Sequence, residues 1–229
     1  MTTLLSTLGT LYKRISRAAL KANRNPMDVT LIAVTKTVGV EAIREAVDAG
    51  IRVFGENRVQ EARDKIEYLR NIPEEIRWHM VGHLQRNKAK YAVPLFDLIH
   101  SVDSAALAVD INNHADRIDK IQDILVEVKL SPEEAKHGIS KEELGELLNT
   151  ITAMKNLNLR GLMTIPPYSD NPGDARPYFK KLRTLRDELE GRGFHLPELS
   201  MGMSHDFEIA IEEGATIVRI GTAIFGERR

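Results

Sequence analysis

The sequence contains no cysteine among its 229 residues. This absence excludes a disulfide framework, a thiolate metal site, an iron–sulfur cluster and a cysteine nucleophile. An excess of charge of either sign is also missing, because 32 Lys and Arg residues stand against 33 Asp and Glu residues. The chain therefore has no overall electrostatic reason to bind nucleic acid or an anionic membrane, and any partner must be recognised locally.

Long apolar runs are absent as well. Near the N-terminus apolar residues recur at helical spacing, but Lys13, Arg14 and Arg17 interrupt them too often for a secretory signal or a membrane span. This pattern predicts an amphipathic helix within residues 1–27 that packs on the rest of the chain. Because five basic residues and no acidic one precede Asp28, a mitochondrial presequence is the alternative. We expect a cytoplasmic protein.

What is present is the composition of a globular protein, with 42% hydrophobic and 28% charged residues. Eight short apolar runs predict strands at residues 30–34, 52–54, 77–81, 98–100, 124–128, 160–164, 199–201 and 217–220. Helical patterns separate them at residues 41–48, 58–70, 104–118, 141–156, 175–190 and 206–213, and residues 83–91 form a weaker one.

Strict alternation of strands and helices predicts a parallel sheet that is buried on both faces. Eight strands favour a single eight-stranded parallel (TIM-type) barrel of the α/β class over an open sheet, with the N-terminal helix as an addition. No linker divides the sequence, so we expect one domain over residues 1–229. Two long connections, residues 131–138 and 166–173, are candidate lids at the C-terminal face of the barrel.

A lysine lies at the C-terminal end of the first predicted strand. Lys36 ends an apolar run, Leu31 to Lys36, which would place its ammonium in a partly desolvated barrel mouth. Burial favours the neutral amine, which condenses with carbonyl groups to a Schiff base. The carbonyl group could belong to a sugar, as in an aldolase, or to pyridoxal phosphate.

Residues near the C-terminus favour pyridoxal phosphate over a sugar. Hydroxyl groups and glycines follow the last two predicted strands, where barrels commonly bind a phosphate. Arg219 lies in an otherwise apolar strand, which is costly unless it is paired, and it would face the same mouth as Lys36. A lysine, a phosphate site and an arginine match the aldehyde, phosphate and ring nitrogen of pyridoxal phosphate.

Seven segments of the sequence resemble the pyridoxal phosphate homeostasis protein family, in the same order and over nearly the whole chain. They are residues 33–36 (AVTK), 54–61 (FGENRVQE), 78–88 (WHMVGHLQRNK), 100–104 (HSVDS), 161–163 (GLM), 199–204 (LSMGMS) and 218–226 (VRIGTAIFG). The resemblance implies a fold like the N-terminal barrel of alanine racemase, with pyridoxal 5'-phosphate as cofactor. It also implies a Schiff base at Lys36 and an arginine, Arg219, at the pyridine nitrogen. The remaining implied cofactor-binding residues are Ser200, Ser204, Gly221 and Thr222 at the phosphate, and Asn57, His79 and Met80 along the cofactor.

The function that the resemblance implies is buffering and delivery of pyridoxal phosphate in vitamin B6 and amino acid homeostasis, without efficient turnover. An arginine at the pyridine nitrogen disfavours its protonation, which makes the ring a poorer electron sink. The sequence also ends at Arg229, just after the last strand, so we expect no second domain to supply the opposite acid or base of a racemase. We expect a monomer that is not an enzyme and whose partners, besides the cofactor, are apo-enzymes. The alternative is a Schiff-base enzyme, either a pyridoxal phosphate racemase or an aldolase.

Three other patterns carry less weight. His79 and His83 have the spacing of a helical zinc pair, but Gly82 and the strand context argue against one. Ser204, His205 and Asp206 are too close in sequence to fold into a catalytic triad. The basic residues between 85 and 90 are more typical of a solvated helix face than of an RNA site. We therefore expect no metal site and no nucleic-acid partner.

Overall fold

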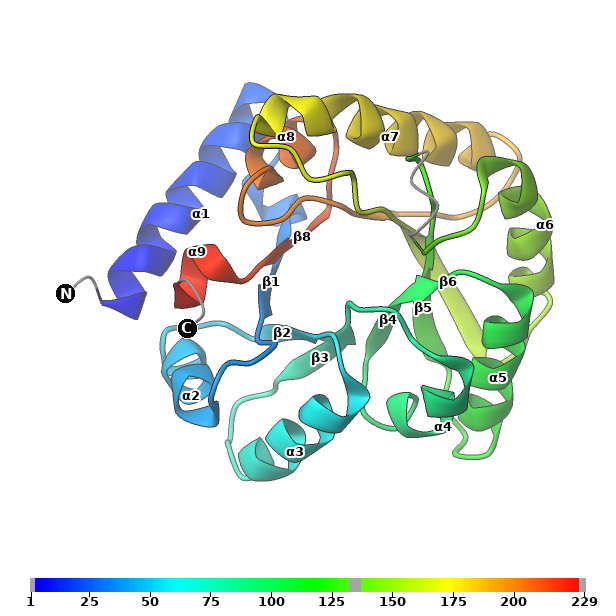
Figure 1. Ribbon diagram of the computed structural model, residues 1–229, viewed down its shortest axis with the longest axis horizontal. Coiled ribbons are helices and arrows are strands. Elements are labelled where there is room, and N and C mark those ends of the chain that lie inside the picture. The colour runs from blue at the N-terminus through cyan, green and yellow to red at the C-terminus, as the bar shows by residue number, and fades with distance from the viewer. Residues whose placement is uncertain (1–2, 132–136, 227–229) are drawn as a thin grey trace.

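The computed structural model describes residues 3–131 and 137–226 and shows a closed parallel barrel surrounded by helices (Figure 1). Its strands are β1 (Thr30–Val34), β2 (Val53–Glu56), β3 (Arg77–Met80), β4 (Leu98–Val102), β5 (Gln122–Glu127), β6 (Leu157–Met163), β7 (Glu198–Ser200) and β8 (Ile217–Ile220). Each strand pairs with the next in the sequence, and β1 also pairs with β8, with Ile32 beside Arg219. The predicted eight-stranded barrel is confirmed.

The described α-helices are α1 (Leu4–Lys21), α2 (Val40–Asp48), α3 (Val59–Leu69), α4 (Ala89–Ala92), α5 (Ala105–Asp116), α6 (Lys141–Thr152), α7 (Arg176–Glu190), α8 (Phe207–Glu212) and α9 (Thr222–Phe225). Short 3-10 helices cover Pro26–Asp28, Arg86–Lys88 and Pro172–Ala175. The weak pattern at residues 83–91 thus becomes a 3-10 turn followed by the single turn α4. The short helix α9 was not predicted, because four residues are too few to show a helical period. Of the candidate lid at 131–138, residues 132–136 lie outside the described residues.

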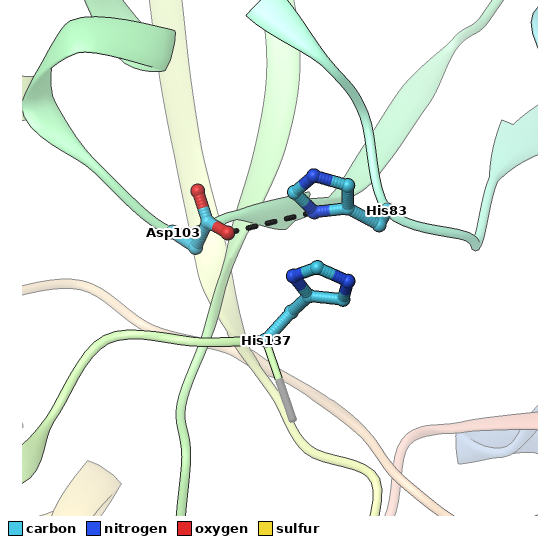
Figure 2. A group of neighbouring side chains, drawn as sticks. All are labelled: His83, Asp103 and His137. Atoms are coloured by element: carbon cyan, nitrogen blue, oxygen red, sulfur yellow. Dashed lines mark ion pairs between the residues drawn. The ribbon is translucent and has the colours of Figure 1, made fainter. Parts of the chain in front are cut away.

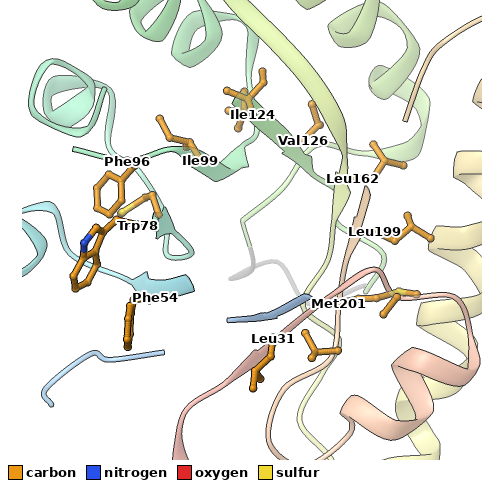
Figure 3. Packing of buried hydrophobic residues seen from close by; sticks show 14 of the residues in the cluster. Leu31, Phe54, Trp78, Phe96, Ile99, Ile124, Val126, Leu162, Leu199 and Met201 are labelled. Carbon is orange, nitrogen blue, oxygen red and sulfur yellow. The ribbon is translucent and has the colours of Figure 1, made fainter. Parts of the chain in front are cut away.

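The strands bury apolar side chains on both faces, as a parallel barrel requires. Alternate residues of each strand face outward and pack against the helices, and Figure 3 shows part of this layer, including Leu31, Phe54 and Trp78. A smaller apolar cluster fills the barrel interior and consists of strand residues and of Val81, just after β3: Ile32, Val34, Val81, Leu98, Leu125, Met163 and Ile217.

The N-terminal helix α1 packs along α8, as the apolar stripe Leu8, Leu11 and Ile15 requires (Figure 1). Its end is tied to the last part of the barrel by Arg24, whose Nη1 donates to the carbonyl oxygens of Ile211 and Ala215 at 2.8 Å each. None of the helices in residues 3–131 and 137–226 combines the length and the apolar character that a membrane crossing needs.

Candidate functional site

A cavity of about 430 Å³ opens at the C-terminal mouth of the barrel. This volume is in the range of small-molecule sites. The segments that follow six strands, β1, β2, β3, β6, β7 and β8, contribute to its wall. The lining residues are Val34, Lys36, Asn57, Val81, Gly82, Ile165, Tyr168, Met203, Ser204, His205, Arg219, Gly221 and Thr222. The structure therefore brings together six of the nine residues expected to bind the cofactor.

Lys36 lies in a tight turn two residues beyond the end of β1, which has the bounds predicted for the first strand. The turn is closed by the Val38 N–H, which donates to the Thr35 carbonyl oxygen at 2.8 Å. Within it, Thr37 has a φ of 62°, a left-handed conformation that is unusual for a β-branched residue. Such a conformation persists only where its surroundings hold it, so the position of Lys36 depends on the contacts of this turn.

A buried ionic network under the turn supplies those contacts. Lys65 of α3 donates to the Thr35 carbonyl oxygen at 2.6 Å and to carboxylate oxygens of Glu56 and Glu61 at 2.7 and 2.6 Å. Glu61 also accepts the Thr37 N–H at 2.6 Å, and Glu56 accepts the Thr35 hydroxyl at 2.6 Å. Burial raises the pKa of Glu56, against the opposing effect of Lys65. Sequence reasoning missed the role of Lys65 and Glu61.

Arg219 extends from β8 into the cavity and is almost completely buried. Its guanidinium donates to the carbonyl oxygen and hydroxyl of Ser200, at 2.9 and 2.5 Å, and to the Thr164 carbonyl oxygen at 3.0 Å. These bonds compensate the burial that made an arginine improbable in an apolar strand. Burial lowers the pKa of Arg219 to about 10, against the opposing charges of Glu127 and Asp206. The side chain is thus a cation at neutral pH.

Glu127, the last residue of β5, is a buried acid near Arg219 that sequence reasoning missed. Burial raises its pKa to about 7, although the Arg219 charge acts in the opposite direction and the Asp103 charge adds to the increase. A signal was present, because a carboxylate in an apolar strand is as unusual as the arginine in β8.

A chain of hydrogen bonds continues from Arg219 across the barrel interior. The Ser200 hydroxyl lies 2.9 Å from His100 Nδ1, and His100 Nε2 lies 3.1 Å from His79 Nδ1. The Ser200 hydroxyl accepts a hydrogen bond from Arg219, so its own proton can be donated in a hydrogen bond to His100 Nδ1. Burial lowers the pKa of His79 to about 4 and the pKa of His100 well below its usual value. Both imidazoles are therefore neutral at pH 7.

Three expected cofactor-binding residues are placed away from the cavity lining. Ser200 is fully buried and holds Arg219, while His79 is joined to it through His100. Met80 points to the opposite side of β3 from His79, into the outer apolar layer, and it lines a neighbouring hollow of about 280 Å³. Adjacent residues of one strand cannot all face the same cavity, which is the physical reason for the difference.

One end of the cavity carries hydroxyl groups and backbone N–H donors. Ser204 Oγ accepts the N–H groups of Gly221 and Ala223, each at 3.3 Å, at the start of α9. Gly221 and the exposed Thr222 line the same end. Hydroxyl groups at this place, together with the backbone N–H groups that Ser204 now accepts, are the donors that a phosphate monoester needs.

Asn57, which follows β2, lines the same cavity as Lys36 and Arg219 and carries an unusual buried oxygen. Its Oδ1 has no hydrogen-bond partner among the described residues. The close approach of the two chain segments requires Gly82, since a Cβ there would lie 2.7 Å from the Asn57 carbonyl oxygen. An unpartnered acceptor on a cavity wall is suited to a ligand that carries a hydroxyl group.

The weaker sequence patterns do not assemble into the sites they imitate. His79 bonds to His100 inside the barrel, whereas His83 pairs with Asp103 outside it. Ser204, His205 and Asp206 do not form a catalytic triad. His205 Nε2 lies 3.1 Å from the Asp170 carbonyl oxygen, and Asp206 accepts the Met203 N–H. As expected, these three neighbouring residues bond to separate partners.

Comparison with known proteins agrees with the site. The sequence model of the family described as "Alanine racemase, N-terminal domain" matches residues 7–229. The pyridoxal phosphate homeostasis protein of Aquifex aeolicus is 49% identical over 223 residues, which cover 97% of each chain. That of Escherichia coli is 39% identical over 216 residues, 94% of this chain and 92% of the relative.

Solved structures give the same result. PipY of Synechococcus elongatus, determined with PLP bound, is 41% identical with a TM-score of 0.83, covering 93% of this chain and 100% of PipY. An alanine racemase of Clostridium difficile shares the fold at 15% identity, with a TM-score of 0.70 over 95% of this chain and 56% of the racemase. The chain belongs to the pyridoxal phosphate homeostasis protein family, whose members share the alanine racemase N-terminal domain.

Proposed function

We propose that this protein binds pyridoxal 5'-phosphate in the cavity at the barrel mouth and acts in vitamin B6 and amino acid homeostasis. The observation that carries the proposal is the presence of Lys36, Arg219 and the Ser204 end in one cavity. The relative with PLP bound, at 41% identity, supports the same ligand. In this proposal the barrel is one cofactor-binding unit that functions as a cytoplasmic monomer.

Each part of the cofactor has a matching group on the chain. Lys36 Nζ forms a Schiff base with the cofactor aldehyde and releases water, while Ser204, Gly221 and Thr222 bind the phosphate. Arg219 donates a hydrogen bond to the pyridine nitrogen, and the unpartnered Asn57 Oδ1 accepts one from the ring hydroxyl. Ser200 and His79 contribute indirectly, by holding Arg219 in place.

The cofactor is held without efficient turnover. When bound, pyridoxal phosphate supplies an electron sink for carbanions, and the sink is strongest when the pyridine nitrogen is protonated. The pKa of Arg219, about 10, keeps this residue a donor that does not accept a proton at neutral pH. A pyridine nitrogen beside this cation stays unprotonated, so carbanion chemistry is poorly supported. Buffering the cofactor and passing it to apo-enzymes requires only reversible binding.

The test is a visible absorption spectrum of the purified protein before and after borohydride reduction, followed by peptide mass mapping. We expect a pyridoxyl adduct on Lys36 that is absent from the Lys36→Ala variant. Lys129→Ala is the matched control, because Lys129 follows β5 at the same mouth and lines a separate hollow.

Two outcomes would contradict the proposal. An adduct that maps to Lys129, or a protein that stays colourless after addition of pyridoxal phosphate, would remove the binding assignment. Production of D-amino acids at an enzyme-like rate would keep the assignment of Lys36 and overturn the homeostasis role.

A further inference from the structure

Three side chains that the proposed cofactor site does not use meet at the rim of the barrel (Figure 2). His83 follows β3, Asp103 follows β4 and His137 lies in the connection after β5. One ligand atom of each, an imidazole nitrogen or a carboxylate oxygen, lies within 4.8 Å of the other two. His83 Nδ1 is 3.6 Å from Asp103 Oδ2, and the two imidazole rings stack with centroids 3.7 Å apart.

Two imidazoles and one carboxylate are a ligand set for a divalent transition metal, and zinc in particular is bound by such triads with an open position for water. We propose that His83, Asp103 and His137 form a binding site for Zn²⁺ or a similar first-row divalent cation. The site joins three successive loops of the barrel mouth, the face where such barrels place their functional groups.

The distances are close to those of a formed site. Ligand atoms at ~2.0–2.1 Å from a tetrahedral zinc ion lie about 3.3 Å from one another, so the His83 to Asp103 distance needs to change little. The two rings are nearly parallel, with 10° between their planes, and a metal lies in the plane of each ring that binds it. One ring must therefore rotate about its χ2 bond, a torsion with a broad energy minimum.

The surroundings leave room for this rotation. The side chain of His83 is 34% exposed and that of Asp103 17% exposed, while His137 lies at the surface.

The triad is separate from the cavity proposed to bind pyridoxal phosphate. None of its three residues lines that cavity, although Gly82, the neighbour of His83, does. The proposed metal site and the proposed cofactor site can therefore be tested independently of each other. This inference goes beyond the proposed function and does not depend on it.

The test is calorimetric titration with ZnCl₂ of the chelator-treated protein, with its cofactor content as purified. Co²⁺ absorption in the visible range reports imidazole and carboxylate ligands. We expect one strong site per chain and a loss of affinity of about tenfold or more in His137→Ala and in Asp103→Asn, since even outer-shell changes cost ~10–100-fold. His195→Ala is the matched control, because His195 is exposed in the connection before β7.

The Lys36→Ala variant separates the two sites, because we expect it to keep full zinc affinity. Loss of zinc binding in Lys36→Ala would place the metal on the cofactor and overturn the proposal. Unchanged affinity in His137→Ala, or the absence of a strong site in the unaltered protein, would also overturn it. Melting temperatures provide a fold check: zinc should raise the melting temperature of the unaltered protein and of His195→Ala, but not that of His137→Ala.

Discussion

His79 and Glu127 are buried groups whose pKa values are shifted by burial in opposite directions, so that they change the pH dependence of stability in opposite ways. Burial lowers the pKa of His79 from 6.5 to about 4 and raises the pKa of Glu127 from 4.5 to about 7. Below pH 6.5 the unfolded chain binds a proton at His79 that the folded chain does not, so stability is lost as the pH falls toward 4. At Glu127 the folded chain keeps a proton that the unfolded chain releases above pH 4.5, so stability is lost as the pH rises toward 7.

Each displacement amounts to about 3 kcal/mol in the free energy of unfolding across its window. We expect His79→Asn, which retains a hydrogen-bonding atom but does not titrate, to lose less stability than the unaltered protein between pH 6.5 and 4. Glu127→Gln removes the loss that Glu127 causes as the pH rises, so between pH 4.5 and 7 its stability should change more favourably than that of the unaltered protein. Urea unfolding at a series of pH values measures both slopes. Slopes equal to those of the unaltered protein and of the surface variant His195→Ala would refute the expectation.

Lys65 is the cation of the buried network under the Lys36 turn. Its replacement by Met leaves the fully buried Glu56 without its cation and the Lys36 turn without a donor to Thr35. Breaking a buried ion pair on one side costs about 3–5 kcal/mol of unfolding free energy.

The matched control for this variant is Arg63→Met in the same helix. Arg63 pairs with Asp64 at the surface, where an ion pair contributes about 1 kcal/mol or less. Denaturant unfolding of both variants gives the comparison. Equal losses in the two variants would show that the network under Lys36 is not an important contributor to stability.

Lys36 and Arg219 were identified from the sequence because each is a charge at an otherwise apolar strand. Glu127 carried the same signal and was missed. Lys65 carried none, since its burial follows from the docking of α3 against the β1 turn, and a helical lysine normally faces solvent. Local sequence reports an anomalous residue but not the tertiary contact that buries a normal one.

Among the elements, β6 depends most visibly on a glycine. Gly161 has a φ of 154°, and a Cβ at this position would overlap the carbonyl oxygen of Glu198 in β7. The two strands pair at this point, so a side chain would force them apart. We expect Gly161→Ala to destabilise the protein by several kcal/mol or to prevent soluble expression.

Gly145 gives a control with the opposite expected sign. It lies within α6, where an added Cβ meets nothing within 4 Å. Gly145→Ala should therefore stabilise the protein by about 0.5–1 kcal/mol, the usual gain in a helix interior. Thermal unfolding of the two variants measures both effects. A neutral result for Gly161→Ala would contradict the close approach of β6 and β7.

The order and type of the elements followed from the sequence because apolar runs and helical patterns alternate regularly along it. The side of β3 on which Met80 lies did not follow. A signal was present, because polar Arg77 and His79 alternate with apolar Trp78 and Met80 along β3. The alternation alone does not say which face is the interior, since both faces of a barrel strand are normally apolar. The orientation becomes defined only when the register with β2 and β4 places His79 inside.

At the scale of the whole molecule, α1 connects the beginning of the chain to the end of the barrel. Arg24 makes two charged hydrogen bonds to backbone carbonyls near α8, so we expect Arg24→Ala to lose about 1.5–3 kcal/mol of unfolding free energy. Lys21→Ala, which removes a surface pair with Glu212, should lose about 1 kcal/mol or less. Equal melting temperatures for the two variants would show that this connection does not stabilise the barrel.

The pairing of β1 with β8 has a consequence for the biosynthesis of the protein. Lys36 follows the first strand and Arg219 lies on the last, and the two residues share a cavity only because these strands are neighbours. A nascent chain on the ribosome carries the lysine long before the arginine has been translated. The cavity that holds the proposed cofactor site therefore forms only after β8 has been translated and has paired with β1.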